Sequence, residues 1–176
     1  VGDWSLMDSG ANNVASAAQL GLENLTGEPS DSLLIGFVPT RMLAWSRIRL
    51  GWLTPEVVTK SDIAHIVAPH VTSSLPEAVI VPISADEYFL LENRVSRLAL
   101  DGRVPQIRFS GETDGVWLSV DDYDAFIPGS GLLVWHVDDA VIRNSGPDRP
   151  LNSNPDYRIA PFQFRRGISL EEADGL

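Results

Sequence analysis

Hydrophobic and polar residues follow different patterns in the two parts of the chain. In the first part, residues 11–31 are rich in Ala, Asn, Ser and Gly and predict a loop with one short helical turn. Residues 41–50 place apolar and basic positions at helical spacing, and Gly51 and Pro55 would end that helix. The first part is therefore expected to consist of loops and one helix.

From residue 57 onward the period changes to two and β-branched residues dominate. Such alternation is typical of strands, and the short polar turns between the segments predict antiparallel pairing. The expected strands are residues 63–67, 78–83, 87–91, 116–120, 131–137 and 167–170. The predicted fold class is α+β, with a loop-and-helix part over residues 1–56 and a mostly antiparallel, β-rich part over residues 57–176 packed on it.

The start of the chain joins a short apolar run to turn-forming residues. Trp4 to Met7 lead directly into Asp8, Ser9 and Gly10. Asp and Ser bond to nearby backbone in turns, and Gly supplies a positive φ. We therefore expect Met7 to lie in a tight turn with its side chain pointing inward. Taken alone, the segment favours the simpler interpretation, a methionine that fills a gap in the core; the later segments reverse that preference.

Composition excludes several partners and chemistries. The chain has 176 residues, 44% of them hydrophobic, and 13 Lys and Arg against 24 Asp and Glu give a formal net charge of −11. Nucleic acids and anionic membranes require basic patches, so neither is an expected partner. The absence of cysteine excludes disulfides and thiolate zinc sites. No apolar run reaches the roughly 20 residues of a membrane-spanning helix, so no membrane insertion is expected.

Three later segments can be set beside the Trp4–Gly10 segment. They are residues 43–53 (LAWSRIRLGWL), residues 87–94 (EYFLLENR), and residues 128–138 (PGSGLLVWHVD) with NSNP at 152–155 and LEEADG at 170–175. In this order the four segments resemble immune inhibitor A-type secreted zinc metallopeptidases, which are metzincin-like. The segment around Met7 has the position of the Met-turn in such enzymes.

The resemblance implies an endopeptidase that hydrolyses protein or peptide substrates with one zinc ion. Histidines and a third ligand would hold the zinc, and a Glu would act as general base on the zinc-bound water. Met7, Asp8, Ser9 and Gly10 would form the floor of that site. A His-Glu-x-x-His motif does not occur in this sequence. The general base and zinc ligands are therefore expected upstream of Val1, in a longer secreted protein.

Within that protein, residues 1–56 would be the C-terminal part of the catalytic domain, corresponding to the lower half of a metzincin-like domain. They would carry the Met-turn and the helix. Residues 57–176 would form the β-rich portion. The sequence begins with Val and shows no leader peptide, which also favours a fragment or a processed product.

Calcium is a second candidate cofactor, because the end of the chain is rich in the oxygen ligands that calcium prefers. The residues that would bind it are Asp138, Asp139, Asn152, Asn154, Glu172 and Asp174. The simpler interpretation is that Asn and Asp favour turns. A calcium-stabilised, non-catalytic extracellular module that binds a protein or glycan is accordingly the alternative function.

Two further sites are less favoured. The three histidines, His65, His70 and His136, could share a zinc ion only if the chain turned at Pro69, because an odd spacing on a strand places two side chains on opposite faces. The acidic pairs at 121–122 and 138–139 permit a glycosidase interpretation. Adjacent acids on a chain usually point apart, however, so that interpretation depends on the abundance of acids rather than on their spacing.

Overall fold

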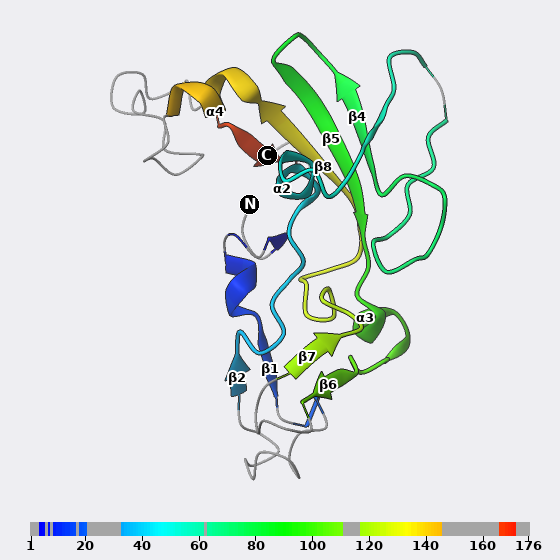
Figure 1. Ribbon diagram of the computed structural model, residues 1–176, viewed down its shortest axis with the longest axis vertical. Coiled ribbons are helices and arrows are strands. Elements are labelled where there is room, and N and C mark those ends of the chain that lie inside the picture. Colours follow the sequence, from blue (N-terminus) through cyan, green and yellow to red (C-terminus); the bar gives the residue numbers. More distant parts are fainter. Residues whose placement is uncertain are drawn as a thin grey trace. The chain divides into compact units, whose positions relative to one another are not determined.

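The computed structural model describes residues 4–5, 7, 9–16, 18–20, 33–61, 63–110, 117–145 and 166–171. The chain divides into two compact units (Figure 1). The first unit comprises residues 1–46, 68–72 and 94–131, and the second comprises residues 47–67, 73–93 and 132–176. The prediction divided the chain once, at residue 56. In the structure, each unit instead combines segments from before and after that residue.

The first unit contains two small antiparallel sheets. One pairs β1 (Val14–Ser16) with β2 (Leu33–Ile35), and the other pairs β6 (Ile107–Phe109) with β7 (Trp117–Val120). A 3-10 turn, η2 (Ser9–Asn12), precedes β1. The core of the unit is apolar and partly aromatic; it contains Ala15, Leu20, Val38 and Val120, with Leu34, Phe37, Ile107, Phe109, Tyr123 and Phe126 packed against them.

Gly36 is required where the chain leaves β2. Its φ of 69° is in the left-handed region, and a Cβ at this position would lie 2.8 Å from the carbonyl oxygen of Ala11. Its backbone N–H donates to the carbonyl of Asn13 at 2.8 Å. Glycine tolerates both the φ and the close approach because it has no side chain.

A short helix, α3 (Arg97–Asp101), is fixed by capping at both ends. The hydroxyl of Ser96 accepts from the backbone N–H of Ala99 at 3.0 Å and donates to the carbonyl of Ala125 at 2.6 Å. Gly102 follows the helix with a φ of 75°, and its N–H donates to the carbonyl of Leu98. Serine at the N-cap and a left-handed glycine after the last turn satisfy backbone groups that a helix leaves unpaired.

Arg94 and Asp124 form a buried ion pair in the first unit. The guanidinium Nε donates to Asp124 Oδ2 at 2.8 Å, and Nη2 donates to Oδ1. The remaining donors reach backbone carbonyls, that of Trp4 at 3.0 Å and that of Arg41 at 3.3 Å. A buried charge is tolerated only with such complete pairing. The pair and these two carbonyls therefore join four distant segments of the unit.

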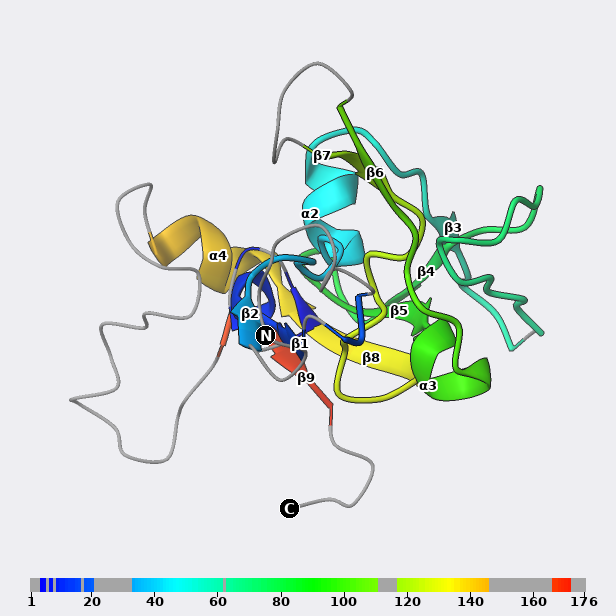
Figure 2. The same cartoon turned by 90° about the horizontal axis from the view of Figure 1, so that it is seen from below.

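The second unit is built on a five-stranded sheet in the order β3-β4-β5-β8-β9, which can be followed in Figure 2. Its strands are β3 (Glu56–Val57), β4 (Ala78–Pro82), β5 (Glu87–Arg94), β8 (Gly131–Asp138) and β9 (Ile168–Leu170). The pairs β4/β5 and β8/β9 are antiparallel, and β3/β4 is parallel. Helix α2 (Ala44–Arg49) precedes β3, and helix α4 (Asp139–Ser145) follows β8.

Alternation and register define two faces of this sheet. The Trp135 face carries residues that are almost fully buried, among them Ala78, Leu90, Glu92, Trp135, Val137 and Ile168. The His136 face carries the intervening residues, among them Val79, Val81, Phe89, Leu91, Leu132 and His136. Several of these are only half-buried or exposed. The sheet therefore has one closed face and one more open face.

Most of the predicted strands are confirmed, although their ends differ. Strands β4 and β9 are slightly shorter than expected, β5 continues to Arg94, and β8 continues to Asp138. The prediction of a strand at 63–67 is wrong, because this segment is irregular and residues 63–65 are exposed. The predicted helix is shorter, Ala44–Arg49, and the predicted loop at 11–31 contains β1.

Replacing Asp124 by Asn should destabilise the protein by about 3–5 kcal/mol, because the buried Arg94 charge would lose its counter-charge. Asp86→Asn is the matched control, since Asp86 pairs at 2.5 Å with Arg143 on the surface, where an ion pair contributes little. Urea unfolding of both variants measures the difference. Equal midpoints for the two variants would contradict a central role for the buried pair.

Candidate functional site

One polar residue from each of three segments singled out in the sequence (43–53, 87–94 and 128–138, called family-like below together with 4–10) lies in a cluster on the Trp135 face of the second unit. Glu92 of β5 is fully buried, and its Oε1 accepts from the indole Nε1 of Trp135 on β8 at 2.9 Å. Arg47 of α2 lies with its Nη2 3.9 Å from Glu92 Oε2 and donates from Nη1 to Glu77 Oε2 at 2.5 Å. Three segments far apart in the sequence therefore share one buried polar cluster.

The buried carboxylate of Glu92 is compensated within this cluster. A buried carboxylate requires hydrogen bonds or a counter-charge. For Glu92, Trp135 donates the hydrogen bond and Arg47 provides the counter-charge. Within the described residues, Arg47 Nε and Nη2 have no hydrogen-bond partner, so the attraction between Arg47 and Glu92 is electrostatic rather than a hydrogen bond. The cluster is a structural support with little access to solvent.

A second polar group lies on the His136 face. His136 Nε2 is 2.9 Å from Glu87 Oε1, and Nδ1 is 3.7 Å from Glu171 Oε1. The imidazole is tilted against the ring of Phe89, with centroids 5.4 Å apart. The side chain of His136 is 30% exposed. This face thus presents an imidazole and two carboxylates that solvent can reach.

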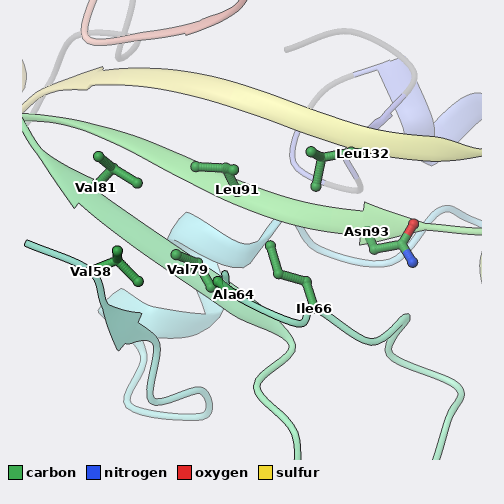
Figure 3. Close-up of a pocket in the computed structure, with 8 residues that line it drawn as sticks. All are labelled: Val58, Ala64, Ile66, Val79, Val81, Leu91, Asn93 and Leu132. Atoms are coloured by element: carbon green, nitrogen blue, oxygen red, sulfur yellow. The ribbon is translucent and has the colours of Figure 1, made fainter. Parts of the chain in front are cut away.

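An apolar groove lies on the same His136 face. Its volume is about 440 Å³, and Figure 3 shows Val79, Val81 and Leu91 on the strands with the irregular segment of Ala64 and Ile66 beside them. Val58, Leu132 and Asn93 complete the lining. The segment expected to be a strand at 63–67 therefore forms one wall of a groove.

The segment around Met7 differs from the expectation in one respect. Met7 lies in a turn, and its backbone N–H donates to the hydroxyl of buried Ser5 at 3.2 Å. Its side chain, however, is 70% exposed rather than inward-pointing. Asp8 lies outside the described residues, as does the side chain of Ser9.

The backbone of this segment is nevertheless held at both ends. The carbonyl of Trp4 accepts from the buried Arg94, and the carbonyl of Gly10 accepts from the N–H of Thr40 at 2.9 Å. Gly10 itself is buried. The turn is therefore anchored by its backbone, although Met7 points to solvent. Whether the four residues form an active-site floor stays a prediction.

Only two of the six candidate calcium ligands lie in the described residues. Asp138 is buried, and its Oδ1 accepts from the N–H groups of Ala140 and Val141 at 3.0 Å, which caps α4. Asp139 pairs with Arg49. Asn152, Asn154, Glu172 and Asp174 lie outside the described residues. Both described carboxylates thus already have partners in the fold, and the calcium site stays a prediction.

The carboxylates of the other acidic pair, Asp121 and Asp122, have structural partners. Asp121 Oδ1 accepts from the N–H of Gln106 at 2.7 Å, and Asp122 accepts from the N–H groups of Asp124 and Arg97. Across the described ranges, no three His, Asp or Glu side chains are placed to hold a metal ion. This includes His65, His70 and His136. Neither the glycosidase interpretation nor the three-histidine site gains support.

A salt bridge on the surface joins the last turn of α4 to Asp86. Arg143 donates to Asp86 Oδ1 at 2.5 Å, and the hydrogen bond to Asp86 raises the pKa of Arg143 above its ordinary value. The backbone N–H of Asp139 donates to the carbonyl of Asp86 at 2.7 Å. The β4–β5 turn and the beginning of α4 are thereby joined.

Sequence reasoning missed the buried charges Glu92, Arg94, Asp124 and Arg47. A signal was present for two of them, because Glu92 and Arg94 continue the alternation of Leu90 on the buried face of β5. A charged residue at a predicted inward position indicates a buried pair. The partners could not be identified, since they come from distant segments.

Comparison of the chain with family models, curated proteins and solved structures finds no match. The resemblance to zinc metallopeptidases therefore depends on the four segments described above. In the described part of the chain, none of the helices has the length and apolar character that a membrane span requires.

Replacing Trp135 by Phe should cost about 1–3 kcal/mol of stability, because buried Glu92 would lose its hydrogen-bond donor. The ring volume changes as well, so Trp135→Phe is best compared in the Glu92→Gln background. There the loss should be smaller, because a neutral amide is less costly to leave unpaired. Trp52→Phe is the control, since Trp52 is 69% exposed. Unfolding monitored by circular dichroism tests this, and equal losses in both backgrounds would contradict the assigned role of Glu92.

Proposed function

We propose that this chain is part of a secreted zinc-dependent endopeptidase and supports its active site without supplying the zinc ligands. The observation that carries the proposal is the hydrogen bond from Arg94 Nη1 to the carbonyl of Trp4 at 3.0 Å. It joins the Met-turn-like segment to the EYFLLENR segment through a buried ion pair. Two family-like segments are thus bonded to each other in the first unit.

The other family-like segments are joined in the second unit. Glu92 of EYFLLENR contacts Trp135 of GLLVWHVD and Arg47 of AWSRIRLGWL. His136 contacts Glu171 of LEEADG. In an enzyme of the proposed kind, residues of these segments that bond to one another would form a structural frame. Their burial argues for support of a site rather than direct chemistry.

Zinc would supply a Lewis acid and a water of lowered pKa in such an enzyme. The described residues do not fit the metal, because they offer no group of three ligating side chains. The ligands and the general base are therefore proposed to belong to residues upstream of Val1. Met7 and the anchored backbone around it would lie beneath the metal.

The direct test is to determine the coding sequence upstream of Val1 and to express the intact protein. A His-Glu-x-x-His segment shortly before Val1, with peptidase activity that a zinc chelator removes and zinc restores, is the expected result. The 176-residue chain by itself should hydrolyse no casein and retain no stoichiometric zinc. An upstream reading frame without that segment, or zinc held by the chain alone, would overturn the proposal.

Met7→Ala in the intact protein should lower zinc retention and peptidase activity while leaving the unfolding temperature of the isolated chain nearly unchanged, because its side chain is 70% exposed there. Leu100→Ala is the matched control, since Leu100 is 71% exposed on α3. Zinc content after dialysis and activity on casein are the measurements. Equal zinc retention by both variants would count against the Met-turn assignment.

The alternative function is a calcium-stabilised, non-catalytic extracellular module that binds a protein or glycan. The apolar groove on the half-open His136 face is the observation that favours it. Calcium titration by calorimetry distinguishes this possibility, because binding would release or absorb heat and raise the unfolding temperature. Absence of both effects would remove the calcium part of the alternative.

A further inference from the structure

The groove on the His136 face has an apolar floor and an open rim. Val79 on the floor is 1% exposed, whereas Leu132 at the rim is 54% exposed. Val79 and Val81 lie on the same face two residues apart, which is the side-chain repeat of a strand. Asn93 brings one amide to the lining (Figure 3). This combination of several apolar contacts and one polar group is typical of ligand sites.

The charged side chains that the strands place on this face are acidic. Glu56 is exposed and pairs in register with Val79, which places both side chains on the His136 face. Glu87 and Glu171 lie farther along the same face, against His136. Among the described strand residues on this face, none is Lys or Arg. In contrast, Arg47, Arg49 and Arg143 of this unit are each paired with an acid elsewhere.

We propose that this groove binds an extended peptide segment whose aliphatic side chains are flanked by lysine or arginine. The aliphatic side chains would cover Val79, Val81 and Leu91, and the amide of Asn93 would bond to the peptide backbone. The basic residues would face Glu56 at one end and the Glu87 and Glu171 carboxylates toward the other. Charge complementarity of this kind selects partners and accelerates association. The proposal concerns binding alone and stands independently of the peptidase function.

The test uses fluorescein-labelled peptides and the full 176-residue chain. Lys-Leu-Val-Leu-Lys should bind with saturable anisotropy that weakens as salt is added. Glu-Leu-Val-Leu-Glu and Lys-Ser-Thr-Ser-Lys should bind more than about tenfold more weakly, because one reverses the charge and the other removes the apolar contacts. Equal binding of the acidic peptide, or no binding of the basic apolar one, would overturn the proposal.

Two substitutions locate the site. Leu132→Arg should weaken binding of the basic peptide more than about tenfold, because it places a like charge at the rim. Leu118→Arg is its control, since Leu118 is 61% exposed on β7 of the first unit. Glu56→Gln should reduce the preference for the basic over the acidic peptide, whereas Asp101→Asn, on α3, should not.

Folding and self-association are checked on the same samples. Circular dichroism establishes that Leu132→Arg is folded, and if it is not, the comparison of Glu56→Gln with Asp101→Asn decides. Sedimentation of the chain without peptide shows whether a second copy occupies the groove. A dimer that Leu132→Arg dissociates would overturn the proposal, as would unchanged peptide binding by both groove variants.

Discussion

The fold depends most on the requirement that buried charges be paired. Arg94 loses its hydration completely in the first unit, and it remains in place because Asp124 and two backbone carbonyls take up its donors. An unpaired charge in such a position would cost more than several apolar contacts contribute. The segments that provide the partners, around Trp4, Arg41 and Asp124, therefore have to come together whenever this unit folds.

Strand β5 shows which features could be predicted from the sequence. Alternation over residues 87–91 predicted the strand, and the same alternation continues through Glu92 to Arg94. The prediction ended too early because charged residues are usually taken as exposed. The strand predicted at residues 63–67 is absent for another reason. Its apolar and β-branched residues are typical of a strand, but the segment forms an irregular wall of the groove. The prediction that the Met7 side chain points inward is also wrong, because a turn pattern contains no information about what surrounds the side chain.

The candidate site could be predicted only in outline for a related reason. The sequence singled out the segments and suggested a family as an expectation. The pairing between Glu92 and Trp135 and that between Arg94 and Trp4, however, join residues that are more than 40 positions apart. Local sequence patterns contain no information about contacts between residues so far apart in the chain. The structure adds that these motif residues stabilise each other.

The two faces of the five-stranded sheet divide these tasks. On the Trp135 face, buried polar groups are paired within the fold, so substitution there is expected to act on stability. On the His136 face, several apolar and acidic groups remain accessible to solvent. Apolar surface that stays exposed contributes nothing to the stability of the fold. Exposed aliphatic residues beside a groove lower solubility unless something covers them. The open face therefore carries the accessible groups that the proposed peptide binding requires, whereas the closed face carries the buried groups that hold the sheet in place.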